Sequence, residues 1–90
     1  MVEPRTKIEF GQKSITLEKL ASKLHEAFPN GFGSMAATAY IKSEYGGEYP
    51  HISGHQSRMQ FPDLYSSLVE VGLLRERMQA KRRYYEVVGK

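Results

Sequence analysis

The fold prediction starts from one stretch near the C-terminus, Leu74-Arg75-Glu76-Arg77-Met78-Gln79-Ala80-Lys81-Arg82-Arg83-Tyr84-Tyr85-Glu86-Val87-Val88. This stretch reads as two short strands around a basic turn. Residues 75–90 hold six Lys or Arg against two Glu, a net charge of +4, whereas residues 1–74 hold seven basic against eight acidic side chains, a net charge of −1. The net charge of +3 therefore comes from one end of the chain, and a basic hairpin is an electrostatic handle for a polyanion.

Three segments upstream of the hairpin are predicted to be helices, because their apolar side chains recur at three-and-four spacing. The first follows Thr16, a helix N-cap, and ends at Pro29-Asn30-Gly31. The second follows an N-cap at Ser34 and ends at Gly46-Gly47, which favours a left-handed C-cap. Its expected buried face consists of Ala36, Ala37, Tyr40, Ile41 and Tyr45.

The third helix opens at Phe61-Pro62-Asp63, because proline is tolerated at the first helical position and an acid suits the positive end of the helix. Residues 7–10 alternate in polarity and predict a short strand or an ordered arm, and residues 47–60 predict a long loop with room for one short strand. Residues 1–6 are expected to be flexible. The sum predicts one α+β domain over residues 1–90, a three-helix winged-helix-like domain with a C-terminal β-hairpin as its wing.

The order of three helices, then Gly72-Leu73-Leu74 and a basic hairpin ending Tyr84-Tyr85-Glu86-Val87-Val88, resembles the winged helix-turn-helix superfamily over residues 14–88. Within it, Met59-Gln60-Phe61-Pro62-Asp63-Leu64-Tyr65-Ser66-Ser67-Leu68 is similar to the LOTUS-type domains, small winged helices associated with RNA or with helicase partners. The resemblance to the winged helix-turn-helix superfamily implies a DNA-binding, transcription-regulating role. One departure argues against sequence-specific reading of a major groove, because the expected outer side of the third helix includes two acids. That side consists of Asp63, Ser66, Ser67 and Glu70.

The candidate nucleic-acid-binding residues lie on the predicted wing and just before the third helix. The wing supplies cations for phosphate contacts and an aromatic ring for stacking on a base, in Arg75, Arg77, Lys81, Arg82, Arg83 and Tyr84. Strand alternation puts Arg83 and Tyr85 on one face and Arg82 and Tyr84 on the other, so only part of the cluster can face one ligand. Arg58 and Gln60 precede the helix whose N-terminal end lies nearest the bases in a helix-turn-helix. The alternatives are a wing whose charges prevent edge-to-edge aggregation and a loop that is merely long and polar.

Other function classes find little support in the sequence. The chain has no Cys, and His51-x-x-x-His55 is interrupted by Gly54, so no metal ligand is expected. No nucleophile elbow, phosphate-binding glycine motif or carboxylate pair is present, so we expect neither catalytic residues nor a cofactor nor a small-molecule substrate. No apolar run approaches the roughly 18 residues of a membrane span, and no signal peptide is visible. A cytoplasmic or nuclear protein with no membrane partner is therefore expected.

These observations predict a small nucleic-acid-binding protein with DNA preferred over RNA, in the manner of a transcriptional regulator. A homodimer is a further expectation, with the first helix or the arm residues Ile8 and Phe10 at the contact. Two alternatives stay open. The acidic outer side of the third helix and the alanine-rich second helix suit a protein-interaction module, and tyrosines next to arginines suit an RNA-binding, LOTUS-like domain.

Overall fold

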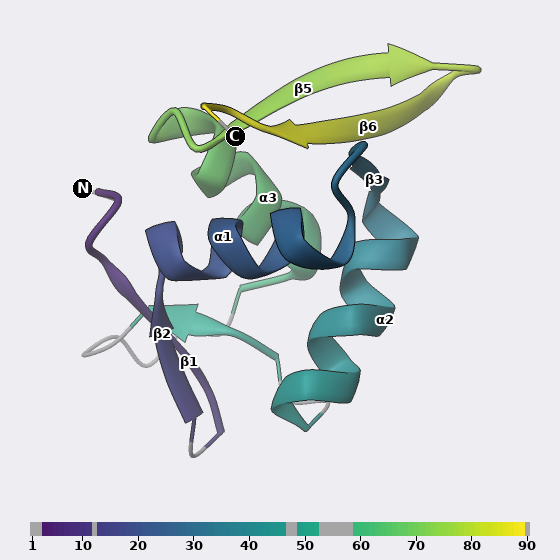
Figure 1. The fold of residues 1–90 in the computed structure, drawn as a ribbon. Helices are drawn as coiled ribbons and strands as arrows, with labels where there is room; N and C mark the ends of the chain where they lie inside the picture. Colours follow the sequence, from purple (N-terminus) through teal and green to yellow (C-terminus); the bar gives the residue numbers. More distant parts are fainter. Residues whose placement is uncertain (1–2, 12, 47–48, 53–58, 90) are drawn as a thin grey trace.

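The computed structural model describes residues 3–11, 13–46, 49–52 and 59–89. Within these residues the elements follow the order β1 (Lys7–Phe10), β2 (Lys13–Thr16), α1 (Leu17–Ala27), β3 (Phe32–Gly33), α2 (Ser34–Tyr45), β4 (His51–Ile52), α3 (Phe61–Glu70), β5 (Leu74–Gln79) and β6 (Arg82–Val87). The strands form two antiparallel sheets, with strand orders β2-β1-β4 and β3-β6-β5. Figure 1 shows α1 and α3 between the two sheets.

The element order corrects the predicted architecture. The α+β class, the three helices and the C-terminal hairpin are present, but an N-terminal hairpin precedes α1, and a strand lies between each pair of helices. The order β-β-α-β-α-β-α-β-β differs from that of a three-helix winged helix with a C-terminal hairpin, so the winged-helix prediction is wrong. The physical reason is strand length: β3 and β4 have two residues each, too few for an alternation pattern to appear in the sequence.

The start of α1 is held by hydrogen bonds from both sides of the cap. The hydroxyl of Thr16 accepts from a first-turn amide at 3.3 Å, as predicted for an N-cap. The amides of Leu17 and Glu18, which no helix carbonyl can reach, donate to the carbonyls of Thr6 and Pro4, each at 3.0 Å. The N-terminal segment that contains these two carbonyls is therefore tied to α1, and its predicted flexibility stays a prediction.

The other two helices begin within one residue of their predicted starts, and one of their N-caps differs from the prediction. Gly33, not Ser34, is the N-cap of α2, and no side chain caps that end. Gly46 has φ 91° and forms the predicted left-handed C-cap. Ala36, which was expected to be buried, is exposed. The third helix begins at Phe61, as predicted.

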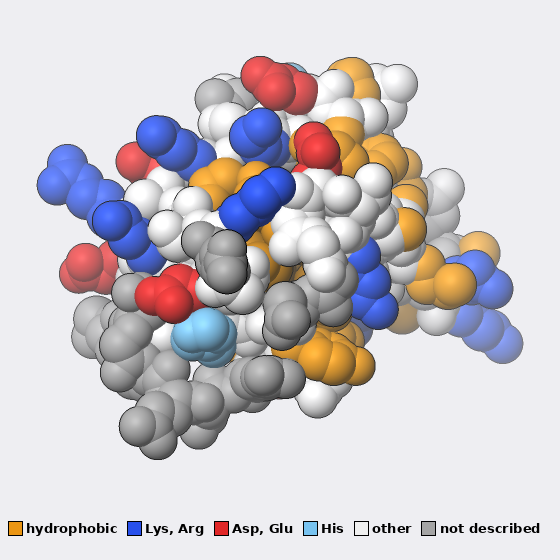
Figure 2. Space-filling view, turned by 90° about the horizontal axis from the view of Figure 1, so that it is seen from below, with side chains coloured by type: hydrophobic (Ala, Val, Ile, Leu, Met, Phe, Trp, Pro, Cys, Tyr) orange, Lys and Arg blue, Asp and Glu red, His pale blue; other side chains and the backbone are white. Residues whose placement is uncertain are grey.

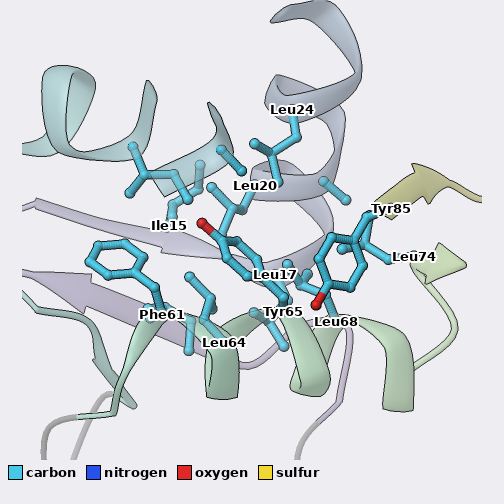
Figure 3. Close-up of a cluster of buried hydrophobic side chains, with 14 of the residues drawn as sticks. Ile15, Leu17, Leu20, Leu24, Phe61, Leu64, Tyr65, Leu68, Leu74 and Tyr85 are labelled. Atoms are coloured by element: carbon cyan, nitrogen blue, oxygen red, sulfur yellow. The ribbon is translucent and has the colours of Figure 1, made fainter. Parts of the chain in front are cut away.

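A single apolar cluster lies between the sheets and the helices. Its largest members include two tyrosines, and the ring centroids of Tyr65 and Tyr85 are 5.4 Å apart. The Tyr65 hydroxyl shares a hydrogen bond of 2.7 Å with Thr38, so its buried polar atom is satisfied. Figure 3 shows side chains of α1, α3, β5 and β6 meeting in this cluster, among them Leu17, Leu20, Leu24, Leu64, Tyr65, Leu68, Leu74 and Tyr85.

The arm residues of β1 also belong to the core. Ile8 is 0% and Phe10 is 1% exposed, and the Phe10 ring stacks on Tyr45 with centroids 4.9 Å apart. Side chains that are already buried inside one chain are not free to form a contact between two chains. Burial of Ile8 and Phe10 argues against the arm as the contact, while the predicted dimer, through the first helix or the arm, stays a prediction.

Candidate nucleic-acid interface

The C-terminal hairpin has a base inside the fold and a tip outside it. Strands β5 and β6 pair from Leu74↔Val87 to Gln79↔Arg82, and β3 pairs with β6 at Tyr84 and Tyr85. We define the hairpin base as residues 74–77 with 84–87, and the hairpin tip as residues 78–83. All residues of the tip are exposed. Figure 1 shows the tip extending past the start of α2.

The turn at the tip has an uncommon sequence for its geometry. Its two central residues, Ala80 and Lys81, have φ of 52° and 65°. Positive φ at both positions is the type I′ arrangement, whose twist matches that of paired strands and which usually takes Asn-Gly. A side chain with a Cβ in this region costs about 1–2 kcal/mol per residue. The turn therefore stores strain, and the strand pairing behind it holds it in place.

The register divides the hairpin side chains between two faces, because strand side chains alternate. The outer face carries Arg75, Arg77, Gln79, Arg82, Tyr84 and Glu86. The inner face, which reaches the core at the base, carries Leu74, Glu76, Met78, Arg83, Tyr85 and Val87. The predicted separation of Arg82 and Tyr84 from Arg83 and Tyr85 is thereby confirmed. The outer face has three Arg and one Glu, whereas the inner face has one of each, so the outer face holds the excess positive charge.

Two of the five hairpin cations are paired with carboxylates. Arg77 Nε lies 2.9 Å from Glu86 Oε1, and Arg83 Nε lies 3.3 Å from Glu76 Oε1. The two arginine side chains remain 56% and 58% exposed, so each pair contributes at most about 1 kcal/mol. In both pairs the closest contact is made by Nε, and a guanidinium has further N–H donors for a phosphate. Pairing therefore reduces the charge of these arginines without removing their capacity to bind an anion.

The other three hairpin cations are free of such pairing. Arg75, Lys81 and Arg82 are exposed and form no ion pair with any carboxylate in the described part of the chain. One lies at the base, one in the turn and one beside the turn. Together they present positive charge along the outer face and at the end of the hairpin.

The aromatic residue of the outer face is fixed in position. Tyr84 is half-buried, and the guanidinium carbon of Arg77 lies 5.7 Å from its ring centroid. A Cβ at Gly31, which has φ +101°, would lie 2.7 Å from Tyr84 Cε2 and 2.9 Å from the Tyr85 carbonyl oxygen. The loop after α1 thus approaches β6 so closely that only glycine fits there.

A cleft separates the hairpin tip from the start of α2. Strand β3 ends at Gly33, opposite Tyr84, and the chain then turns into α2, while β6 and β5 continue into the tip. The space between them has a volume of about 590 Å³, within the range of ligand sites. We call it the hairpin cleft, and it is lined by Gly33, Ser34, Met35, Gln79, Ala80, Arg82, Arg83 and Tyr84.

A second cleft lies beside the first along the surface of α2. It has a volume of about 330 Å³, lies between α2 and the start of α3, and shares Ser34 and Met35 with the hairpin cleft. We call it the helix cleft, and it is lined by Ser34, Met35, Thr38, Ala39, Lys42, Pro62 and Tyr65. Among the described residues, the linings of both clefts include three cations and no Asp or Glu.

The structure places the predicted wing residues on one hairpin, but it does not place Gln60, which precedes α3, beside them. Gln60 is the exposed N-cap of α3 and lines neither cleft, and Arg58 lies outside the described residues. The predicted acidic side of α3 is present, since Asp63 and Glu70 are exposed. No sequence pattern indicated Met35 as a site residue, because its position beside the hairpin depends on β3.

The end of the molecule around the N-terminal sheet has a different charge pattern. Figure 2, viewed from that side, shows Lys or Arg and Asp or Glu side chains interspersed. His51 Nε2 lies 3.2 Å from Glu9 Oε1 and joins β4 to β1, while His55 falls outside the described residues. In the parts of the chain that the structure describes, no group of three His, Asp or Glu side chains is placed to hold a metal ion. No helix there has the length and apolar content to cross a membrane.

Comparisons with known proteins give this geometry no relative. No family model, no curated protein and no solved structure matches the chain. The resemblance to LOTUS-type domains and the functions it implies therefore stay predictions.

Proposed function

We propose that this protein binds nucleic acid through the outer face and the tip of its C-terminal hairpin. The observation that carries the proposal is the set of exposed cations, Arg75, Lys81 and Arg82, that no carboxylate in the described residues neutralises. Phosphates are the ligands that such a set attracts most strongly, and the contacts release counterions from the nucleic acid. Arg77 and Arg83 add capacity, at the expense of their pairs with Glu86 and Glu76.

The charges of the hairpin support backbone contacts more than base reading. Asp63 and Glu70 on the exposed side of α3 repel phosphate, so this helix is poorly suited to a major groove. Cations on a narrow hairpin contact phosphates, which position a protein on nucleic acid but carry no sequence information. A preference for DNA, a role in regulating transcription, and a cytoplasmic or nuclear location are parts of the proposal that only binding and localisation experiments decide.

The proposal is tested by replacing the free cations with neutral side chains of similar length. The variant Arg75→Gln, Lys81→Gln, Arg82→Gln is titrated against labelled duplex DNA and single-stranded RNA at about 50 mM salt, by fluorescence anisotropy. The affinity is expected to fall about tenfold or more, because each lost phosphate contact lowers both the affinity and its salt dependence. Circular dichroism should show an unchanged fold, because all three side chains are exposed.

A matched control separates this site from a general effect of charge. The variant Lys7→Gln, Lys19→Gln, Lys23→Gln removes the same charge from exposed positions on β1 and α1. Its affinity should stay within about threefold of the parent value, as expected for cations away from a phosphate-binding face. Equal losses in the two variants would contradict a binding site on the hairpin. A folded parent protein that binds neither nucleic acid at low salt would overturn the proposal and favour a protein partner.

A further inference from the structure

We propose that the hairpin cleft and the helix cleft together form a groove for a single strand of nucleic acid, with an unstacked base beside Met35. This inference rests on the proposed function and names the form of nucleic acid that the site takes. The two clefts share Ser34 and Met35 in their linings and therefore lie side by side.

The charge of the groove fits a strand of phosphates. Arg82 and Arg83 line its hairpin end and Lys42 lines its other end, while the linings contain no acidic residue among those the structure describes. Met35 and Lys42 are seven residues apart on one helix, a rise of about 10 Å. A single strand that passes over the start of α2 could therefore place phosphates near cations at both ends and a base on the less polar surface between them.

The middle of the groove offers apolar surface to a base. Met35 is 80% exposed and Ala39 is also exposed, and both side chains line the helix cleft, where a ligand could contact them. Tyr84 lines the hairpin cleft and is held in place by its contact with Arg77 and by the approach of Gly31. Proteins that bind single strands combine a positively charged groove with aromatic side chains on which unpaired bases stack, and Tyr84 is the partly exposed aromatic residue of this groove.

A duplex fits this groove less well than a single strand. In a duplex the bases are stacked and paired, so a base reaches a cleft only after it is unstacked, which costs a few kcal/mol. The hairpin can still contact duplex phosphates from its outer face, so weak duplex binding is compatible with the groove.

The experiment adds one carboxylate to the groove and the same carboxylate just outside it. Met35→Glu places the charge where the two clefts meet, and Ala36→Glu places it on the next residue of the same helix, which is exposed and lines neither cleft. Both variants, with Lys42→Gln as a third, are titrated against a labelled oligothymidine and against a DNA duplex of equal length. Circular dichroism and thermal unfolding check that each variant keeps the parent fold.

The expected result has two parts. The parent protein should bind the single strand at least about tenfold more tightly than the duplex, since the base enters without unstacking. Met35→Glu should weaken single-strand binding about tenfold and Lys42→Gln severalfold, whereas Ala36→Glu should change it less than about threefold, because it lies outside the groove.

Other outcomes overturn the inference without touching the proposed function. Equal affinity for single strand and duplex would refute the groove, as would equal losses in Met35→Glu and Ala36→Glu. If binding is lost in the Arg75, Lys81 and Arg82 variant but not in Met35→Glu, the hairpin binds nucleic acid and the groove does not. If the parent protein binds neither ligand, both ideas fail.

Discussion

The base and the tip of the C-terminal hairpin belong to the same two strands but have opposite surroundings. At the base, Leu74 is 3% and Tyr85 is 1% exposed, and Tyr85 lies against Tyr65. At the tip, every residue from 78 to 83 is exposed, and Met78 is 64% exposed. Burial of apolar surface holds the base in the fold, whereas strand pairing holds the tip in spite of its strained turn.

This difference separates folding from the proposed binding within one element. Substitutions of the buried side chains at the base, Leu74 and Tyr85, change packed surface, and their effect on the free energy of unfolding is large. Substitutions at the tip leave the packed surface intact and are expected to stay within about 0.5 kcal/mol unless they alter the turn. The tip can therefore carry a density of positive charge that a packed element could not tolerate. The predictions below test this separation.

The largest effect is expected from Tyr85→Ala at the base. The ring of Tyr85 packs against Phe32 and Tyr65 with centroid distances of 5.8 and 5.4 Å, so truncation leaves a cavity. The loss is expected to be about 3–5 kcal/mol in the free energy of unfolding, measured by urea denaturation. Met78→Ala at the tip should lose less than about 0.5 kcal/mol. Similar losses in the two variants would show that base and tip are not energetically distinct.

The next effect is the pH dependence of stability beneath the base. Burial raises the pKa of Tyr65 from 10.0 to about 12, against a smaller lowering by its hydrogen bond to Thr38. Between pH 10 and 12 the unfolded chain loses this phenol proton while the folded chain keeps it, so the free energy of unfolding falls as pH rises. The contribution is intact below pH 10 and amounts to about 1.4 kcal/mol per pH unit of difference in pKa.

The variant Tyr65→Phe removes this ionisation from both states. Its free energy of unfolding should be lower by about 1 kcal/mol at neutral pH, because Thr38 loses a hydrogen-bond partner. From pH 10 to 12, however, it should fall less steeply than that of the parent protein. Burial also raises the pKa of Tyr40, Tyr45 and Tyr85, so part of the slope should remain. Parallel curves for the two proteins would contradict the buried position of the Tyr65 hydroxyl.

A smaller and opposite effect is expected at the turn of the tip. Ala80→Asn with Lys81→Gly supplies the residues that tolerate positive φ at both positions. The double variant should gain about 1–2 kcal/mol, seen as a rise of several degrees in Tm. Lys81→Gly by itself should account for part of the gain. An unchanged or lower Tm would mean that the turn does not hold this conformation in the folded protein.

The smallest effect on stability is expected from the ion pairs. Glu76→Gln with Glu86→Gln removes the carboxylate partners of Arg83 and Arg77, which are both more than half exposed, so the free energy of unfolding should change by less than about 1 kcal/mol. Binding of nucleic acid should become several times tighter, because the hairpin gains two net positive charges and two unpaired arginines. Weaker binding in this variant would show that the carboxylates position the arginines for the ligand.

The three helices and the C-terminal hairpin could be predicted because each is long enough for its side-chain periodicity to repeat several times in the sequence. The cap at Thr16 and the stop at Gly46 mark helix ends by side-chain and backbone chemistry that acts locally. The two-residue strands β3 and β4 are too short for such a pattern, and they form by pairing with strands distant in the sequence. Strand β2 ends at Thr16, the N-cap of α1, and the helix signal there was the one recognised. These elements overturned the predicted architecture.

The candidate site could be predicted in its charges but not in its shape. The five hairpin cations are visible in the sequence, and alternation assigns Arg82 and Arg83 to different faces. Which arginine meets which glutamate depends on diagonal contacts across the strands, which follow from the register and from side-chain geometry. The clefts depend on where β3 places the start of α2, so the positions of Met35 and Lys42 in the cleft linings could not be predicted from sequence patterns.

The salt dependence of binding tests the central claim most directly. The logarithm of the binding constant for single-stranded DNA is measured against the logarithm of salt concentration from about 50 to 200 mM. Three to five phosphate contacts predict a slope of about −2 to −3.5, and the Arg75→Gln, Lys81→Gln, Arg82→Gln variant should have a slope shallower by about 2. A parent slope near zero, or the same slope in the parent and the variant, would contradict binding of nucleic acid by the hairpin cations.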